Sequence, residues 1–483
     1  MSVSQPASPF DSGNSIPVYV QLKALLLDAI IDGTFGADEQ LPTEFEICKR
    51  YGISRTPVHR ALAELADAGV VIRRRRAGTH VNPDWLAAQS ARRRVSIVVP
   101  EGWAELISEF VPPDVELEVT EVSLSRLHDQ LVHAVASGDA PDLALLDSVW
   151  VTEFAKNAFI RPLDALDPAW VEGEVERAFA GTFVRAHRIE NETLAVQFEA
   201  DVAGLWFERA ALERAQLQPP STWGELRAAA GTCRGRSGGE SIALPAGVRA
   251  GEASSYVLMS VLASNGASVI GADEVTLHSE RAVESLEFLR TLRNDRLIDP
   301  DRVGEDRERP IRALADGHVA FAFAGSYELP ALARTLGVDQ AEAWLRFGFA
   351  PFPAGPSGRS AALTGGMALS VFRQSDRPEL AMRVLQALVG EDSQRSLARS
   401  TGQIPARIAV AGDIAEPGSL LAVSSEQLDG AVMRPLVDSY ERVSQQLQAM
   451  MSEIVAGEAE PRAAALRTAQ MVAAITGLPL ARF

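Results

Sequence analysis

The chain has 483 residues, of which 47% are apolar and 23% charged, and its formal net charge is −18. This length allows about two to four domains, and the composition excludes a disordered or fibrous chain. The longest apolar runs, such as 95–99, are far shorter than the roughly 20 residues that cross a bilayer, so no membrane segment is expected. The N-terminus lacks the basic start and apolar core of a secretory signal, which predicts a cytoplasmic protein.

Charge is unevenly distributed along the chain. Residues 1–95 hold 12 basic and 10 acidic residues, whereas the remaining residues hold 34 and 54. An acidic body repels phosphate, so any contact with nucleic acid is expected in the N-terminal part, where arginines cluster at 73–76 and 92–94. A solvated surface is the other interpretation of these clusters.

Three helices are predicted near the N-terminus, over 17–33, 43–52 and 54–69. The first has apolar residues at helical spacing, and the second opens with a capping-box pattern of Thr43 and Glu46. Ser54 is the expected cap of the third. Its apolar stripe leaves an opposite, exposed face made of Arg55, Thr56, His59 and Arg60.

A β-hairpin with a basic tip is predicted over 70–81, because apolar residues flank Arg73, Arg74, Arg75, Arg76 and Gly78. Two helices joined at a glycine and followed by such a hairpin describe a winged helix-turn-helix. In that fold the second helix of the pair enters the major groove, so its exposed face is the candidate for base readout.

Residues 17–82 resemble the DNA-binding domain of GntR-family transcriptional regulators. The resemblance rests on the blocks at 17–21, 41–44, 51–58, 61–69 and 78–81. It implies binding to double-stranded operator DNA as a homodimer on an inverted repeat. Three positions depart from the family pattern: Phe45 replaces an arginine that touches phosphate, His59 replaces Arg or Lys, and His80 replaces Phe.

The DNA-contacting residues expected from helix, wing and resemblance are Thr43, Arg55, Thr56, His59, Arg60, Arg73, Arg74, Arg75, Arg76, Gly78, Thr79 and His80. We predict the DNA-binding domain over 15–82 and a linker over 83–94. Residues 85–92 are expected to form a short helix there. Trp85 and Leu86 in it could pack between domains or subunits, or cover the winged-helix core locally.

After the linker, apolar strand patterns at 95–99, 115–119 and 143–146 alternate with helical patterns such as 124–136. This alternation predicts a parallel sheet with helices on both faces. Open α/β sheets bind ligands beyond the carboxyl ends of their strands, so the loops at 101–103 and 147–150 are candidate binding edges. Each places polar atoms beside a tryptophan, which suits a carbohydrate but also describes a capped helix beside a core tryptophan.

Residues 95 to about 460 resemble the extracellular solute-binding proteins of sugar transporters. The signatures are the segments 136–142, 194–228, 320–329, 347–356, 363–369 and 401–406. The resemblance implies a two-lobed α/β fold of the periplasmic-binding-protein type 2 over 95–483. The complete chain is therefore predicted to be multidomain, with an α+β winged helix followed by this sensor.

The resemblance also implies that the chain first crosses between lobes at 197–203, with Glu199 or Asp201 facing the ligand, and crosses again near Gly365. Trp206 and Trp223 fit core positions. The ligand-binding residues expected from the loops and the resemblance are Trp103, Asp147, Trp150, Glu199, Asp201, Tyr256, Ser326, Tyr327, Gly365 and Gly366.

No enzymatic motif is apparent in the sequence. The seven histidines are scattered, which argues against a metal site, and no phosphate loop, dinucleotide fingerprint or nucleophile elbow is present. Glu199 and Asp201 could mimic the carboxylate pair of a glycosidase, but we interpret them as the carboxylates of a binding site. Cys48 and Cys233 fit no paired spacing and are expected to be reduced.

These patterns predict a transcriptional regulator that is not an enzyme, uses no cofactor and responds to a small-molecule effector, most simply a sugar. Two alternatives remain at this point. The body could be a dimerisation scaffold or bind a non-carbohydrate ligand, or the chain could be a transporter-associated binding protein that retains a winged helix. Whether the effector releases DNA is not written in the sequence.

Overall fold

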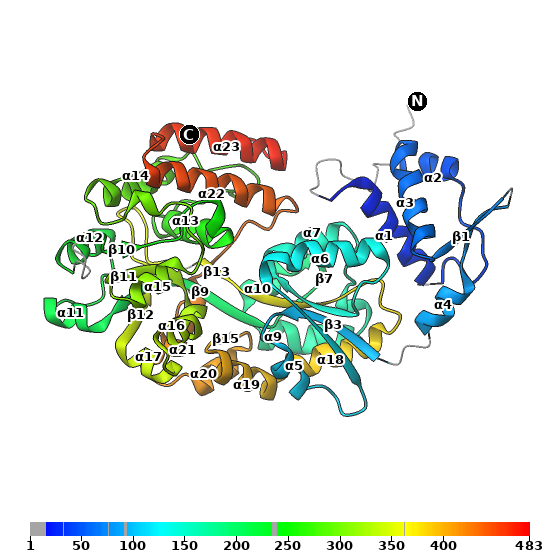
Figure 1. The fold of residues 1–483 in the computed structure, drawn as a ribbon, viewed down its shortest axis with the longest axis horizontal. Helices are drawn as coiled ribbons and strands as arrows, with labels where there is room; N and C mark the ends of the chain where they lie inside the picture. The colour runs from blue at the N-terminus through cyan, green and yellow to red at the C-terminus, as the bar shows by residue number, and fades with distance from the viewer. Residues whose placement is uncertain (1–15, 32, 76, 91–93, 234–238, 362) are drawn as a thin grey trace. The chain divides into compact units, whose positions relative to one another are not determined.

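The chain forms two compact units, which are shown in Figure 1. The computed structural model describes residues 16–31, 33–75, 77–90, 94–233, 239–361 and 363–483. One unit contains the chain up to residue 198 together with 367–393, and the other contains 199–366 and 394–483. We refer to residues 94–198 and 367–393 as the first lobe, and to the other unit as the second lobe.

The three predicted N-terminal helices are present. They are α1 (Val18–Ile31), α2 (Glu44–Tyr51) and α3 (Arg55–Asp67). The capping box of α2 forms, because the Thr43 side chain accepts from the Glu46 amide and the Glu46 carboxylate accepts from the Thr43 amide. Gly52 ends α2 in the left-handed region, with φ 67°. Ser54 occupies the N-cap of α3, but its side chain makes no capping hydrogen bond there, so that detail of the prediction is wrong.

The winged-helix core is built from the apolar stripes of all three helices and the hairpin. The stripe predicted for α3, at 58, 61, 62 and 65, is fully buried. Burial of such side chains is the main stabilising term for a domain of this size. The buried core residues are Leu22, Leu26, Leu27, Ile30, Leu41, Ile47, Val58, Ala61, Leu62, Leu65, Val70, Val71 and Val81.

The predicted wing is an antiparallel hairpin of β1 (Val71–Arg74) and β2 (Gly78–Val81). Gln40 forms a β-bridge with His80, which ties the wing to the chain that precedes α2. Gly78 has φ 93°, and a Cβ at this position would lie 2.5 Å from Gln40 Nε2. Glycine is therefore required here both by the backbone and by this close approach.

The linker contains a short helix, α4 (Pro83–Ser90), which begins two residues before the predicted range 85–92, and residues 91 and 92 lie outside the described residues. Trp85 and Leu86 pack against the winged-helix core. Of the two roles considered for them, the structure shows the local one.

The first lobe is built on a five-stranded sheet in the order β4-β3-β5-β14-β8. Its strands are β3 (Arg94–Pro100), β4 (Glu116–Val122), β5 (Leu143–Asp147), β8 (Val196–Gln197) and β14 (Met367–Val371). The predicted parallel arrangement holds for β4, β3 and β5. It is wrong for β14, which runs antiparallel to β5 because the chain enters this strand on its return from the second lobe.

Helices and short elements surround the first-lobe sheet. They are α5 (Ala104–Glu109), α6 (Leu124–Ser137), η1 (Ser148–Trp150), α7 (Val151–Lys156), η2 (Leu163–Ala165), α8 (Pro168–Trp170), η3 (Val171–Val175), α9 (Glu176–Ala178), α10 (Gly181–Ala186), β6 (Arg188–Ile189), β7 (Glu192–Thr193) and α18 (Pro378–Leu388). The helix α19 (Glu391–Thr401) contains the boundary between the two units at 393/394.

The chain passes between the units at 198/199, 366/367 and 393/394. The first two of these points lie where crossings were expected. The second lobe has a mixed sheet in the order β10-β11-β9-β13-β16, and β12 and β15 also pair with β9. Its strands are β9 (Glu199–Glu208), β10 (Ile242–Ala243), β11 (Phe321–Gly325), β12 (Phe347–Pro351), β13 (Leu363–Gly365), β15 (Ile404–Pro405) and β16 (Val432–Met433).

Trp206 and Trp223 are core residues of the second lobe, as expected: Trp206 is fully buried on β9, and Trp223 stacks on Phe288 at 4.2 Å. The second-lobe helices and turns are α11 (Arg209–Ala215), α12 (Trp223–Thr232), η4 (Val248–Ala250), α13 (Glu252–Ser264), α14 (Glu280–Asn294), η5 (Pro300–Arg302), α15 (Arg309–Ala315), η6 (Ser326–Glu328), α16 (Leu329–Leu336), α17 (Gln340–Arg346), α20 (Ile408–Ile414), α21 (Leu420–Ser425), η7 (Leu428–Gly430), α22 (Tyr440–Ala456) and α23 (Pro461–Thr476). Within the part of the chain that the structure describes, no helix has the length and apolarity to span a membrane.

Candidate functional site

The helix α3, which the sequence predicts to be the recognition helix, presents the expected polar face. Arg55, Thr56, His59 and Arg60 are all exposed, and they lie opposite the buried stripe of the helix. Arg55 is the first residue of α3, and its side chain is 82% exposed. Long polar side chains at the start of a recognition helix can reach base edges in the major groove.

An acidic residue of α2 holds two of these side chains. The Glu44 carboxylate accepts from Arg55 Nε at 2.8 Å, and its other oxygen lies 2.8 Å from His59 Nδ1. Hydrogen bonds from His59 and Arg55 lower the pKa of Glu44 below its usual range, so the carboxylate stays charged at neutral pH. Sequence reasoning missed Glu44, the first residue of α2, because its contact with α3 depends on how the two helices pack.

The fourth side chain, Arg60, is turned toward α1. Its guanidinium lies 3.7 Å from the Tyr19 ring centroid, and its Nη2 donates to the Tyr19 hydroxyl at 2.9 Å. Glu64 accepts from Arg60 at 3.0 Å and from the buried Lys23 at 3.0 Å. Burial raises the pKa of Glu64, but these two hydrogen bonds outweigh that effect and leave the pKa below its usual range. In this structure Arg60 therefore also joins α3 to α1.

The wing exposes Arg73, Arg74 and Arg75, whereas Arg76 lies outside the described residues. Arg74 forms an ion pair with Asp38, and this hydrogen bond lowers the pKa of the Asp38 carboxyl. Thr79 is half-buried, and its carbonyl accepts from the Leu41 amide at 2.8 Å.

Two residues that depart from the family pattern lie in different surroundings. His80 is half-buried, and its Nδ1 is buried without a hydrogen-bond partner in the described structure. Phe45 on α2 has 76% of its surface exposed. Because Phe45 carries no charge, it cannot make the phosphate contact that an arginine makes there.

The first-lobe residues lie at the carboxyl edge of the five-stranded sheet. Trp103 follows β3, and its ring is 5.6 Å from that of Phe198. One Glu121 oxygen accepts the amides of Gly102, Trp103 and Ala104 at 2.8 to 3.0 Å. These backbone hydrogen bonds lower the pKa of Glu121, so a charged carboxylate fixes the loop that carries Trp103.

Asp147 and Trp150 flank η1 at the end of β5. The Asp147 carboxylate caps this turn by accepting the Val149 amide at 3.2 Å. Trp150 is 7% exposed and packs edge-on against His128 at 5.2 Å. The structure therefore shows the capped helix and buried tryptophan that the sequence left as an alternative, and any contact of these residues with ligand remains a prediction.

A buried polar network lies beneath this edge. Gln197 Oε1 accepts from Ser148 at 3.1 Å and lies 2.6 Å from His187 Nε2. Burial lowers the pKa of His187 to about 4, so the ring is neutral at physiological pH. Sequence reasoning did not assign these residues, because nothing in their local pattern distinguishes them from core positions.

Most of the predicted second-lobe residues meet at one edge of the second sheet. Strand β9 runs antiparallel to β11 and β13, so its start lies beside their carboxyl ends: Ala203 pairs with Gly325, and Asp201 pairs with Gly365. Ser326 and Tyr327 follow β11 directly. The topology thus brings residues that are more than 120 positions apart to one edge of the sheet, where we expect a ligand to bind.

Tyr256 of α13 completes this edge. Its hydroxyl donates to the Asp201 carboxylate and lies 3.0 Å from the Leu363 carbonyl oxygen. Burial and the neighbouring Asp201 carboxylate raise the pKa of Tyr256 above its usual range, so the phenol remains protonated. Asp201 itself is half-buried.

An arginine that the sequence analysis missed joins the same group. Arg434 follows β16, has only 4% of its side chain exposed, and pairs with Glu252 at 3.0 Å. Glu252 also accepts hydrogen bonds from Tyr440 and Ser444 of α22. A Cβ at residue 365 would lie 2.6 Å from Arg434 Nη2, which explains the glycine there.

The remaining predicted residues are more deeply placed. Ser326 is 1% exposed and accepts the Val202 amide at 3.2 Å, and Glu199 is 2% exposed. Gly366 has φ 116°, which favours glycine. Tyr327 is half-buried, and burial followed by the neighbouring Glu328 raises the pKa of its hydroxyl.

Glu328 is a buried acid next to this edge. It is 3% exposed, and one of its oxygens has no hydrogen-bond partner among the described residues. Burial raises the pKa of Glu328 to about 7.

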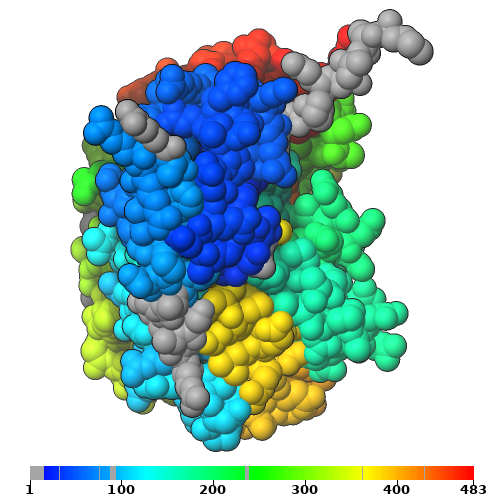
Figure 2. Space-filling view, turned by 90° about the vertical axis from the view of Figure 1, so that its right-hand side faces the viewer, coloured from blue at the N-terminus to red at the C-terminus, as the bar shows by residue number. Residues whose placement is uncertain are grey.

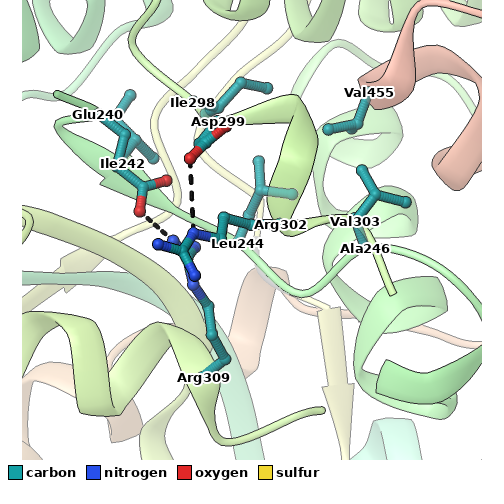
Figure 3. A pocket seen from close by; sticks show the side chains of 10 residues that line it. All are labelled: Glu240, Ile242, Leu244, Ala246, Ile298, Asp299, Arg302, Val303, Arg309 and Val455. Atoms are coloured by element: carbon teal, nitrogen blue, oxygen red, sulfur yellow. Dashed lines mark hydrogen bonds and ion pairs between the residues drawn. The ribbon is translucent and has the colours of Figure 1, made fainter. Parts of the chain in front are cut away.

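A small cavity elsewhere in the second lobe does not offer a second ligand site. Its volume is about 10 Å³, which is room for roughly one water molecule. Figure 3 shows apolar side chains such as Ile242 and Val455 around it, with the ion pair of Arg309 and Glu240 at one side. A sugar cannot be accommodated in this volume.

No metal centre is evident in the described ranges, where His, Cys, Asp and Glu form no group of three or more suited to a metal ion. Cys48 and Cys233 are free thiols. Burial raises the pKa of the Cys233 thiol.

Two family models match the chain in separate segments. Residues 97–395 match the bacterial extracellular solute-binding protein family, and residues 18–81 match the bacterial regulatory proteins of the gntR family. The chain belongs to the bacterial extracellular solute-binding protein family. It carries a GntR-type helix-turn-helix domain in front of that body, as the resemblances implied.

Solved structures with the solute-binding fold confirm the two-lobed architecture. The GacH receptor of Streptomyces glaucescens, studied without ligand and with acarbose, is 20% identical at a TM-score of 0.70, covering 80% of this chain and 99% of its own. A solute-binding protein from Thermotoga lettingae bound to α-D-tagatose is 22% identical at a TM-score of 0.70, with coverages of 80% and 100%. At these identities the likeness shows the fold.

Sequence relatives divide in the same way. A Brucella abortus (strain 2308) protein whose name describes it as a binding protein is 23% identical over 354 residues, which is 73% of this chain and 83% of its own. The HTH-type transcriptional regulator YurK of Bacillus subtilis (strain 168) is 32% identical over 97 residues, 20% of this chain and 37% of its own. The chain is therefore a GntR-type regulator fused to a solute-binding-protein-like body, and both families are non-enzymatic.

Proposed function

We propose that this protein is a cytoplasmic, ligand-responsive transcriptional regulator that binds operator DNA as a homodimer and senses a small polar solute, a sugar or oligosaccharide. The observation that carries the proposal is the second-lobe edge formed by Asp201, Tyr256, Tyr327, Gly365 and Arg434. It joins carboxylate, phenol and guanidinium groups to aromatic rings at the carboxyl ends of strands, in the same chain as an exposed recognition helix.

This chemistry favours a carbohydrate. Sugar hydroxyls need donors and acceptors fixed in space, and the apolar faces of sugar rings stack on aromatic side chains. A hydrogen bond between the Tyr256 phenol and the Asp201 carboxylate holds both side chains in place. They therefore lose little conformational freedom when a ligand binds. The acarbose and tagatose of the two similar solved structures support the same ligand class.

On the DNA side, the proposal rests on exposure and charge. Arg55 and His59 reach outward from the start of α3, and the wing adds three exposed arginines. The acidic remainder of the chain disfavours other routes to DNA. Two copies would place two recognition helices on half-sites about one DNA turn apart, and we propose that the effector alters this placement.

The first experiment identifies the effector by melting the purified protein against a panel of mono- and oligosaccharides. A sugar at 100 times its Kd stabilises the folded protein by about 2.7 kcal/mol. We expect a saturable rise in Tm that is lost in Asp201→Asn and in Tyr256→Phe. The control is Asp129→Asn, because the Asp129 side chain is 95% exposed and is not among the expected ligand-binding residues.

A panel that raises no Tm while operator binding persists would overturn the sugar assignment. A panel of amino acids, polyamines and organic acids would then test a different ligand class. A scaffold role would predict that Asp147→Ala and Asp201→Asn leave regulation of the operator unchanged.

The second experiment selects an operator from a random DNA library and measures its affinity for Arg55→Ala. Loss of a base contact costs about 1 to 3 kcal/mol, so binding should weaken roughly 5- to 150-fold and discrimination at one base position should relax. Arg462→Ala, on the exposed face of α23, serves as the control. Equal affinity of Arg55→Ala and the unsubstituted protein would contradict the proposed role of α3.

A further inference from the structure

The helix α1 is buried on more than one side. Nine of its 14 residues are buried, including the polar Gln21, Lys23 and Asp28. Leu22, Leu26 and Ile30 belong to the winged-helix core, whereas Val20 and Ala24 are buried without belonging to that core cluster. A surface helix of a small domain normally keeps one polar face in water. A second body therefore covers the other face of α1.

That second body is the first lobe. Leu27 of α1 packs on Gly138, the left-handed residue that ends α6: a Cβ at Gly138 would lie 3.0 Å from Leu27 Cδ2. Asp28 Oδ2 is 3.8 Å from Arg373 Nε, which follows β14. Figure 2 shows the N-terminal helices in dark blue directly against the yellow segment that contains Arg373. Leu27 and Asp28 make these contacts, and the buried Val20 and Ala24 lie on the same side of α1 at helical spacing.

On its other side, α1 holds the recognition helix. Tyr19 contacts Arg60 through both its ring and its hydroxyl, and Lys23 pairs with Glu64. Lys23 is 4% exposed, so the cationic end of this ion pair is shielded from water, whereas the Glu64 side chain is 32% exposed. The same helix thus contacts both α3 and the first lobe.

The first-lobe partner of α1 also supports the candidate ligand loop. His128, on α6, lies 2.9 Å from Glu153 of α7 and packs against Trp150 at 5.2 Å. Near the other end of α6, the Val135 carbonyl accepts from Gln374, the neighbour of Arg373. One helix therefore contacts the residues around η1 at one end and α1 at the other.

We propose that α1 fixes the winged helix to the first lobe, so that the recognition helix and the ligand loop at 147–150 turn as one rigid body. The linker 83–94 is then not a hinge between the winged helix and the first lobe. An effector bound to the first lobe changes the position of α3 because the winged helix moves with that lobe. The inference goes beyond the proposed function, and its test needs neither operator nor effector, so the two can fail separately.

The test compares the rotation of the winged helix with that of the first lobe. In a background of Cys48→Ala and Cys233→Ala, a dye is attached either at Lys49→Cys on α2 or at Asp129→Cys on α6, and the time-resolved anisotropy is measured. We expect both labels to decay with the same slow correlation time, that of the entire particle. An additional domain-sized fast component confined to the label on α2 would overturn the proposal.

A disrupting variant gives the complementary result. Ala24→Arg places a charge on the face of α1 that meets the first lobe, outside the winged-helix core. For the label on α2, this variant should add a component to the anisotropy decay that is several-fold faster than the tumbling of the entire particle, because the rotational correlation time scales with the volume that rotates and the released winged helix is small. The decay of the label on α6 should be unchanged. Ala29→Arg adds the same charge at a half-buried position of α1 and is the matched control. Identical decays for the two variants would contradict the proposal.

A charge exchange protects the test against misfolding. Asp28→Arg alone and Arg373→Asp alone should each release the α2 label in part, because each places like charges together. The double variant should recover the slow decay. Failure of the double variant to recover it, with circular dichroism unchanged, would show that this pair does not hold the two bodies together.

Discussion

Single side chains decide how the DNA-reading face is arranged. Glu44 is acidic where DNA would approach, yet it orders Arg55 and His59 through hydrogen bonds of 2.8 Å. An acidic group costs non-specific affinity for phosphate but reduces the number of orientations available to the two readers. We expect this balance to favour specificity over affinity.

Glu44→Gln tests that balance. Without the charge, Arg55 and His59 are held less firmly, while repulsion of phosphate falls. We expect non-specific affinity to rise and the ratio of specific to non-specific affinity to fall about fivefold, which corresponds to about 1 kcal/mol for an exposed pair. Competition binding with operator and random DNA measures the ratio. Glu105→Gln, on the exposed surface of α5, should leave it unchanged.

Glu328 gives a prediction on pH. Its pKa is raised by burial to about 7 in the folded state, against 4.5 ordinarily, so the folded state binds more protons between these values. The free energy of unfolding should therefore fall as pH rises from 4.5 to about 7, by up to about 3 kcal/mol from this group. Glu328→Gln should abolish that contribution, as measured by urea unfolding at several pH values.

The comparison between wild type and variant is essential because His187 acts in the opposite sense. Its pKa is lowered by burial to about 4, so its contribution to stability is lost as pH falls from 6.5 toward 4. This effect is common to both proteins and cancels in the difference. A difference between wild type and Glu328→Gln that does not vary with pH would contradict the assignment.

At the level of elements, the second-lobe edge depends on close approach between β13 and the segment after β16. Residue 365 is a glycine because Arg434 occupies the space of a side chain, and Arg434 in turn neutralises Glu252. Breaking a buried ion pair destabilises the protein by more than the intact pair stabilises it, because a buried charge is left without a partner.

Gly365→Ala should displace Arg434 from its partner. We expect a loss of about 1 to 3 kcal/mol in the free energy of unfolding, in line with overpacked cores, and weaker binding of the sugar found in the melting screen. The control is Gly412→Ala in α20, where an added Cβ meets nothing within 4 Å and should be neutral or stabilising. Equal stability of the two variants would exclude the steric argument.

At the scale of the entire molecule, the proposed binding of an effector and of DNA would be linked by reciprocity. If an effector changes operator affinity by some factor, operator DNA must change effector affinity by the same factor. A tenfold effect requires only about 1.4 kcal/mol of differential binding. This makes the coupling testable from either side.

The corresponding prediction uses the sugar that raises Tm. Its affinity, measured by calorimetry, should shift in the presence of saturating operator by the same factor by which the sugar shifts operator affinity. A random duplex of equal length is the control and should produce a smaller shift. Unequal factors would mean that a further equilibrium, such as a change of oligomeric state, is involved.

Local pattern by itself determined the winged helix of this protein. Its helix starts, the capping box of Thr43 and the buried stripe of α3 depend on spacing within a few residues, which a sequence displays directly. The same holds for the strands β3, β4 and β5 and for the exposed face of α3. Resemblance added the two-lobed body, which alternation of strands and helices indicated only as a parallel sheet.

Tertiary structure alone decided which distant residues meet. Arg434 joins Asp201 and Gly365 because β16 and β9 both pair with β13, and β14 runs antiparallel because the chain returns from another lobe. The second buried face of α1 likewise depends on Gly138 and Arg373, more than 100 residues away. Such pairings arise from the burial of surfaces between elements, and no local spacing in a sequence encodes them.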